Sequence, residues 1–256
     1  MSADAWLRAL IDRHTSAYSR PEFLKAVRAL SSRYVEDRAR LGTRSPLDSA
    51  GKRAAFAGFY APLHYLTVRA IVAALPAASG VSRLLDLGCG TGVGAIAWTE
   101  TAGPPAAITG IDQSPWALEE MRWNCQCRGL PCRTQRGSFV DTLERNLADG
   151  RRGPLDTTGI VCAWSVNELT TDERKRVRAG LFAAHGRGAS VLIVEPMATS
   201  AVPWWETWRA PVLAAGGRAD EWRFEPDLPE ELAQLDDAAG FRRDHLTARS
   251  FWLGHR

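Results

Sequence analysis

Residues 83–112 read RLLDLGCGTGVGAIAWTETAGPPAAITGID and give the clearest indication of the fold. The apolar residues over 83–87 predict a short buried strand, and Val93–Thr101 has the composition of a helix. A second strand is predicted over 106–111, with Asp112 at its end. Strand, glycine-rich loop, helix, strand and acidic residue in this order indicate an α/β unit that binds a ligand at the strand ends.

Beyond this unit, strands and helices continue to alternate along the chain. We predict further strands at 132–136, 159–164 and 189–195, helices at 115–128, 142–147 and 171–185, and a loop at 149–154. Such alternation predicts an α/β fold with a Rossmann-like, doubly wound, mostly parallel sheet of seven strands. Residues 241–253 are expected to supply a terminal antiparallel hairpin.

The first 80 residues show helical spacing of apolar side chains, with a loop at 41–51 and a possible kink at Pro62. We therefore expect an N-terminal helical extension over 1–80 that covers the acceptor site of an α/β domain over 81–256. The α/β domain should contain a Trp-rich insertion around 197–228.

The composition is that of an ordinary globular chain. Its 32 basic and 29 acidic residues give a net charge of +3, and the two signs are mixed along the sequence. This balance permits nucleic acid as a partner but does not indicate it. No apolar run approaches the ~20 residues that span a bilayer, and the N-terminus lacks a signal-peptide block, so we expect a cytoplasmic protein without a membrane partner.

The five cysteines do not form a regular disulfide framework. Cys125, Cys127 and Cys132 follow a C-x-C-x4-C spacing, which differs from the paired C-x-x-C units of a zinc site. We predict reduced thiols and no bound metal.

The glycine-rich loop suits an anionic or zwitterionic cofactor. Glycines at 88 and 90 allow a sharp turn and a close approach of the backbone, and the following helix directs free N–H groups at the ligand. The spacing does not fit the G-x-G-x-x-G pattern of nicotinamide enzymes, because Val93 stands where the third glycine would fall. The D-x-G-x-G-x-G form instead resembles motif I of class I methyltransferases, which implies S-adenosylmethionine as the cofactor. The residues predicted to form this loop site are Asp86, Gly88, Cys89, Gly90, Thr91 and Gly92.

Asp112 strengthens this prediction, because an acid at the end of the second strand can accept hydrogen bonds from both ribose hydroxyls. Taken alone, this acid could also begin a helix cap with Gln113 and Ser114. If Asp112 binds the ribose, Gln113 and Ser114 lie beside the sugar or the adenine. In the same family pattern the loop after the third strand contacts adenine, which here implies Ser138 and Phe139. Trp164, at the end of the fourth strand, completes the predicted cofactor site.

Methyl transfer needs alignment more than a catalytic triad, and none is visible. Asn167 and Glu168 follow the fourth strand, where open α/β sheets place their ligands. Glu168 could orient or deprotonate an acceptor, or it could cap a helix. Tyr60 and His64 lie one helical turn apart in the extension, where they are further catalytic candidates or ordinary packing residues.

Three later segments suggest a narrower resemblance. Trp164–Leu169 reads WSVNEL and Val191–Pro196 reads VLIVEP, and Trp205–Phe224 ends in DEWRF. Together they resemble the methyltransferase-like family of mitochondrial small-ribosomal-subunit assembly factors and its bacterial relatives. Larger members of that family carry an iron–sulfur cluster on cysteines after the fifth strand, whereas this chain has none after Cys162.

Three functions are therefore compared. The first is a methyltransferase, monomeric or homodimeric, that acts on a small aromatic or heterocyclic molecule. The second is a ribosome-associated rRNA methyltransferase or assembly factor, and the third, a nicotinamide oxidoreductase, is disfavoured by the glycine spacing. Trp204, Trp205 and Trp208 form either an aromatic wall for the acceptor or part of the core.

Overall fold

The computed structural model describes residues 1–36, 47–76, 78, 80–148 and 155–254. The loop predicted at 149–154 lies outside these residues, and so do residues 41–46 of the loop predicted at 41–51. The chain divides into two compact units. The first contains residues 1–66 and 223–246, and the second contains residues 67–222 and 247–256.

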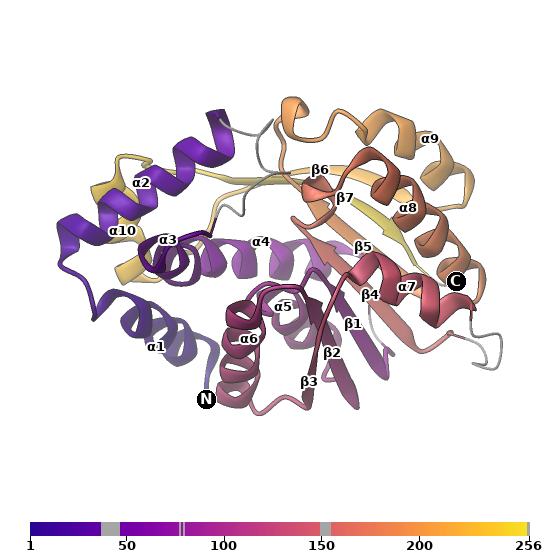
Figure 1. Cartoon of the computed structure of the whole chain (residues 1–256), viewed down its shortest axis with the longest axis horizontal. Helices are drawn as coiled ribbons and strands as arrows, with labels where there is room; N and C mark the ends of the chain where they lie inside the picture. Colours follow the sequence, from indigo (N-terminus) through magenta and orange to yellow (C-terminus); the bar gives the residue numbers. More distant parts are fainter. Residues whose placement is uncertain (37–46, 77, 79, 149–154, 255–256) are drawn as a thin grey trace. The chain divides into compact units, whose positions relative to one another are not determined.

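The second unit is built on a seven-stranded sheet with the strand order β3-β2-β1-β4-β5-β7-β6 (Figure 1). Its strands are β1 (Arg83–Leu87), β2 (Ala107–Asp112), β3 (Cys132–Arg136), β4 (Thr158–Ala163), β5 (Ser190–Glu195), β6 (Arg218–Phe224) and β7 (Leu246–Leu253). The first five strands are parallel, whereas β7 pairs with β5 in the antiparallel direction. The predicted Rossmann-like, doubly wound fold is thereby confirmed.

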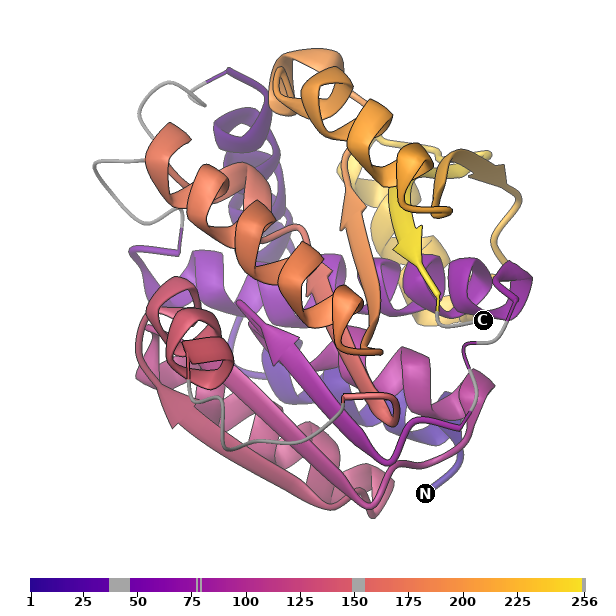
Figure 2. The same ribbon diagram turned by 90° about the vertical axis from the view of Figure 1, so that its right-hand side faces the viewer.

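Helices cover both faces of this sheet. They are the later part of α4 (Ala61–Ala74), α5 (Val93–Ala102), α6 (Pro115–Arg128), α7 (Phe139–Ala148), α8 (Thr171–Gly186) and α9 (Trp205–Ala214), with short 3-10 turns η3 (Val166–Glu168) and η4 (Thr199–Ala201). Helix α5 packs on β1 and β4, and α6 packs on β2 and β3. Helices α7 and α8 pack against each other on the opposite face (Figure 2). No helix in the described part of the chain is both long and apolar enough to cross a membrane.

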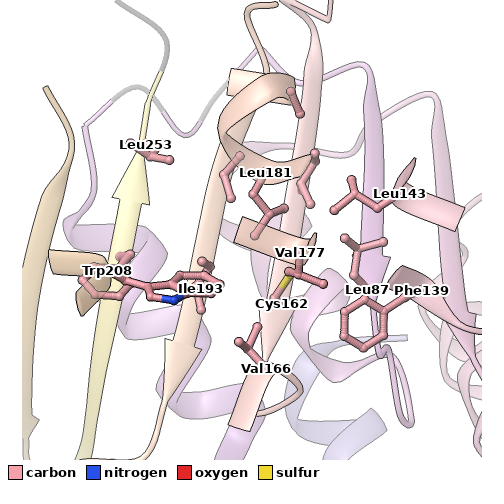
Figure 3. Close-up of a cluster of buried hydrophobic side chains, with 14 of the residues drawn as sticks. Leu87, Phe139, Leu143, Cys162, Val166, Val177, Leu181, Ile193, Trp208 and Leu253 are labelled. Carbon is pink, nitrogen blue, oxygen red and sulfur yellow. The ribbon is translucent and has the colours of Figure 1, made fainter. Parts of the chain in front are cut away.

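The core beneath α7 and α8 explains the strand predictions. Alternate residues of the central strands, such as Leu87, Cys162 and Ile193, point to this face, where Val177 and Leu181 of α8 cover them (Figure 3). The intervening residues of β4 and β5 are buried as well, on the other face of the sheet. Burial on both faces accounts for their almost wholly apolar sequences.

The three clustered tryptophans belong to this core. Trp204, Trp205 and Trp208 are at most 7% exposed. The Trp205 ring stacks on Phe251 of β7, with the ring centroids 3.7 Å apart and the planes 10° apart. Of the two alternatives for this cluster, packing on the sheet is therefore the one that the structure supports.

The terminal hairpin predicted within 241–253 is wrong. Only β7 lies in this range, and it is inserted between β5 and β6. Its hydrogen-bonded neighbours thus come from residues 190–195 and 218–224, separated from it by α10 (Glu230–Ala239). The prediction failed because it assumed a partner next to β7 in sequence, whereas β7 is buried along nearly its whole length and needs strands on both sides.

The first unit is helical, as predicted for the N-terminal residues. It contains α1 (Ala3–Thr15), α2 (Arg20–Glu36), α3 (Ala50–Ala55), the π-helical turn η2 (Phe56–Tyr60), the start of α4, and α10. Ala61 N–H donates to the Phe56 carbonyl, five residues back. Pro62 follows at once and has no N–H to give, so the irregularity expected at this proline takes the form of a π-helical turn just before it.

Candidate active site

The glycine-rich loop leaves β1 through residues that tolerate left-handed backbone. Gly88 and Gly90 have φ values of 69° and 51°. A Cβ added to Gly88 would lie 2.5 Å from the Ser165 Cβ and 3.2 Å from the Phe139 ring. Both the conformation and the space therefore require glycine at 88. The N–H groups of Gly88 and Cys89 donate to the Ile111 carbonyl at 2.9 and 3.0 Å, which fastens the loop to β2.

Asp86, in β1, lies next to the first turn of α5. Its side chain is 1% exposed, and Oδ2 accepts a hydrogen bond of 3.2 Å from the Ala95 N–H. Burial raises the pKa of Asp86 well above its usual range, more than the Ala95 hydrogen bond lowers it. The acid of the motif thus anchors the first turn of α5, and its predicted contact with a cofactor stays a prediction.

Asp112 connects the loop to the end of β2. Its Oδ2 accepts from the Gly90 N–H at 3.0 Å, and its Oδ1 accepts from the Ser114 N–H at 2.8 Å. Ser114 in turn caps α6 by accepting from Ala117 N–H. A carboxylate has about four lone-pair positions, so two remain for a ribose diol. The cap and the ribose roles inferred from the sequence are therefore compatible.

Two α6 residues support the loop and were not found from the sequence. The buried Asn124 donates from Nδ2 to the Thr91 carbonyl at 3.0 Å. Met121 fills the space beside Gly92, whose added Cβ would meet the Met121 Cγ at 2.5 Å. Neither residue belongs to a motif, and their role follows only from the packing of α6 on the sheet.

The remaining predicted cofactor residues occupy the neighbouring strand ends. Ser138 begins α7, where its Oγ accepts from the Asp141 N–H. Phe139 is buried with its ring toward Gly88, and Gln113 is exposed after β2. Their contacts with adenine or ribose stay predictions.

The turn after β4 is strained and firmly held. Trp164 has a φ of 53°, in the left-handed region that a bulky side chain avoids, at a cost of roughly 1–3 kcal/mol. Its N–H donates to the Val194 carbonyl at 2.8 Å. The next residue, Ser165, donates from Oγ to the Leu87 carbonyl at 2.8 Å, which ties this turn to the glycine-rich loop.

Asn167 and Glu168 lie on η3, directly beyond this turn. The Asn167 N–H and the Val166 N–H both donate to Oε1 of Glu195, at 3.1 and 3.0 Å. The Asn167 Oδ1 is buried without a hydrogen-bond partner among the described residues. Glu168 keeps an exposed face, yet desolvation by the surrounding protein and the nearby charge of Asp112 raise its pKa to about 7.

Tyr60 and His64 belong to the first unit. Tyr60 donates its hydroxyl to the Val27 carbonyl at 3.2 Å, and burial raises its pKa. His64 meets Phe56 edge-on, with 5.9 Å between ring centroids. Burial, aided by the Arg243 charge, lowers the pKa of His64 to about 3, so its ring is neutral at physiological pH. Their predicted catalytic roles stay predictions.

The clustered cysteines come together only in part. Cys125 is buried in α6 and hydrogen-bonds to Cys132 at the start of β3, which raises the pKa of Cys125. Within the described residues, no group of three or more His, Cys, Asp or Glu side chains is arranged to hold a metal ion.

The strand ends fit a cofactor that combines a ribose with an amino-acid part. The Gly88 backbone leaves no space for a side chain, Asp112 has free acceptor positions, and the Oγ1 of Thr91 is buried without a partner among the described residues. Asp112 would hold the ribose hydroxyls, and the backbone of residues 88–92 with Thr91 and Trp164 would surround the amino-acid part.

Comparison with known proteins agrees with this geometry. Residues 79–161 match a family model described as a methyltransferase domain, whereas no curated protein matches the chain. Among solved structures, a mitomycin 7-O-methyltransferase is 16% identical, with a TM-score of 0.52 over 92% of this chain and 67% of that one. A plantazolicin methyltransferase in complex with S-adenosylhomocysteine is 11% identical, with a TM-score of 0.49 over 91% of this chain and 96% of that one.

The likeness to the mitomycin 7-O-methyltransferase supports the fold, and the family match supports the chemistry. The matched residues contain β1, the glycine-rich loop, Asp112 and most of β4. Residues 79–161 thus carry a methyltransferase domain, which confirms the predicted enzyme, an S-adenosylmethionine-dependent methyltransferase.

Proposed function

We propose that this enzyme methylates a small aromatic or heterocyclic molecule at a nitrogen or oxygen atom that carries a proton. S-adenosylmethionine supplies an electrophilic methyl group. The protein must then align the acceptor and, where the acceptor is protic, take up its proton. The observation that carries the proposal is the pair Asn167 and Glu168 on η3 after β4.

Glu168 has the properties of a general base. With a pKa of about 7, its carboxyl group exchanges protons near neutral pH, and its exposed face is open to an acceptor. The adjacent Asn167 offers a buried Oδ1 that meets no hydrogen-bond partner in the described part of the chain, and this oxygen can accept an N–H or O–H hydrogen bond. In this mechanism Asn167 orients the protic group, and a Glu168 carboxylate oxygen receives the proton.

The distribution of charge favours a small acceptor over RNA. On α8, the helix that follows η3, Arg176 pairs with Asp141 and Glu144 of α7, and Lys175 pairs with Asp172. Cations engaged in this way are less available for a row of phosphates. The buried tryptophan cluster no longer supports an aromatic acceptor, so the aromatic character of the substrate rests on the sequence-based hypothesis alone.

The test uses S-adenosylmethionine with a tritiated methyl group. The enzyme is incubated with a cell extract divided into a low-molecular-mass fraction and an RNA fraction. Label is measured in acid-precipitable material and in acid-soluble products that chromatography has separated from unreacted S-adenosylmethionine. We expect acid-soluble label that requires Glu168 and falls at least tenfold in Glu168→Gln. Label confined to acid-precipitable material that ribonuclease releases would overturn the proposal.

A ribosome-associated function is the alternative, and one observation favours it. The WSVNEL and VLIVEP segments, which carry the resemblance to the small-subunit assembly family, are joined by the hydrogen bonds from Val166 and Asn167 to Glu195. A shared structural unit is consistent with a shared ancestry. Ribosomal RNA binding with a steep salt dependence would support this alternative.

A further inference from the structure

We propose that Glu195 is a positioning residue that holds Asn167 and Glu168 in place for methyl transfer. This inference rests on the proposed function for its catalytic meaning, but its structural part can be tested without an acceptor. It concerns Glu195, the last residue of β5, whose hydrogen bonds go to the turn after β4.

The burial of Glu195 is the first argument. Its side chain is 0% exposed, and the carboxylate reaches out from the end of β5 toward the neighbouring turn after β4. Burying a carboxyl group is costly unless it forms hydrogen bonds. The Oε2 of Glu195 is buried without a hydrogen-bond partner among the described residues, and a hydrophobic residue would pack there at a lower cost. The acid is therefore best explained by the two hydrogen bonds that Oε1 accepts.

Those two hydrogen bonds are the second argument. A single oxygen, Oε1, accepts from Val166 N–H at 3.0 Å and from Asn167 N–H at 3.1 Å. These N–H groups stand at the start of η3, where the first turn of a helix has no internal partners. Glu195 thus does for η3 what a capping residue does for a helix, but from a different strand.

The strain at Trp164 is the third argument. A left-handed tryptophan persists only where its surroundings hold it. The N–H of Trp164 itself donates to the Val194 carbonyl, and the Oγ of the next residue, Ser165, donates to the Leu87 carbonyl. Glu195 holds the next two residues, Val166 and Asn167, by hydrogen bonds. Glu168 follows them and lies close enough to Asp112 to feel its charge.

The charge of Glu195 is not needed for this role. Burial raises its pKa well above the usual range, with Glu168 adding to the effect. A neutral glutamine keeps an oxygen that can accept the same two N–H groups. Glu195→Gln should therefore preserve the turn, whereas Glu195→Asp, shorter by one methylene, and Glu195→Leu should lose it.

The experiment combines fluorine NMR with binding of S-adenosylhomocysteine. Protein labelled with 5-fluorotryptophan gives a Trp164 resonance that Trp164→Phe identifies. We expect this resonance and the affinity to remain unchanged in Glu195→Gln. In Glu195→Asp and Glu195→Leu the resonance should shift or broaden, and the dissociation constant should rise at least fivefold.

Val191→Ala is the matched control, because Val191 is a buried residue of the same strand that lies away from the turn. It should lower stability and leave the Trp164 resonance in place. An unchanged resonance in Glu195→Asp would overturn the positioning role, and so would an equal shift in Val191→Ala. If the wild-type protein bound no S-adenosylhomocysteine, the cofactor site would be wrong, while the resonance would still test the turn.

Discussion

Replacing Gly88 by alanine tests the geometry of the cofactor loop. The residue has a φ of 69°, and its new Cβ would lie 2.5 Å from Ser165 Cβ. An L-residue in left-handed backbone costs roughly 1–2 kcal/mol. Overpacking of a tight site costs a further 1–3 kcal/mol, approximately. Gly88→Ala should therefore lower the free energy of unfolding by about 2–5 kcal/mol, a large share of a typical domain's stability.

Two other glycines separate these contributions. Gly129 has a similar φ of 66° at the end of α6, but an added Cβ there meets nothing within 4 Å. Gly129→Ala should cost only the conformational part, about 1–2 kcal/mol. Gly186, at the end of α8, also has open space and no left-handed φ, so Gly186→Ala should be neutral or stabilising by up to about 1 kcal/mol.

The assays are urea unfolding and calorimetric titration with S-adenosylhomocysteine. Gly88→Ala displaces Ser165 and the hydrogen bond that Ser165 gives to Leu87, so we expect at least a tenfold loss of affinity. Gly129→Ala and Gly186→Ala should bind within twofold of the wild type. The reasoning would be refuted if Gly88→Ala were no less stable than Gly129→Ala, or if it bound the ligand with wild-type affinity.

Three further predictions concern other parts of the second unit. Because the pKa of Glu168 is raised to about 7 in the folded state, the folded protein binds its proton more tightly than the unfolded chain, and stability from this group is lost as pH rises from about 4.5 to 7. The free energy of unfolding of the wild type, measured in urea, should therefore fall relative to that of Glu168→Gln over this pH range. A difference between the two proteins that does not change with pH would contradict the raised pKa. Asp112→Asn removes the charge beside Glu168 and should therefore lower the pKa of Glu168, measured by carbon NMR. It also removes acceptor capacity for the ribose, so binding of S-adenosylhomocysteine should weaken at least tenfold. An unchanged pKa would show that Asp112 does not act on Glu168. Trp205 stacks on Phe251 in the core, so Trp205→Ala should lower the free energy of unfolding by about 3–5 kcal/mol and leave the affinity for S-adenosylhomocysteine nearly unchanged. A loss of affinity as large as that of Asp112→Asn would place Trp205 at the cofactor site.

The part of the fold nearest the glycine-rich loop could be predicted in detail. The predicted bounds of β1, β3 and α6 agree with those observed. Local signals suffice for β1, which is a short apolar run, and for α6, which begins with a recognisable cap at Ser114 and Pro115. The polar β3 was predicted from its place in the alternation of strands and helices. In the second half, α9, β6 and α10 were missed, since a tryptophan-rich helix with an internal proline and a strand of alternating charges give weak local patterns.

The candidate site was predictable where a motif fixes the backbone, and not where distant side chains meet. The sharp turn at Gly88 and Gly90 and the hydrogen-bonding acid at Asp112 were predictable because these residue types follow from turn geometry and hydrogen bonding. Asn124 was missed, because its contact with Thr91 spans 33 positions and depends on how α6 rotates on the sheet. A polar residue inside an amphipathic helix gives no sign of which carbonyl it will meet.

The role of Glu195 could have been predicted if the register between β4 and β5 had been known. In the sequence, its neighbour Pro196 indicates only a rigid turn after the strand. The register of the sheet places Ala163 of β4 opposite Val194 of β5, so the residues that follow both strands emerge side by side. Once that register is known, a buried acid at 195 can be assigned to the backbone N–H groups of the turn after β4, because the ends of β4 and β5 are neighbours. Register is a property of two strands that lie about 30 residues apart, and hydrophobic periodicity within either strand alone does not contain it.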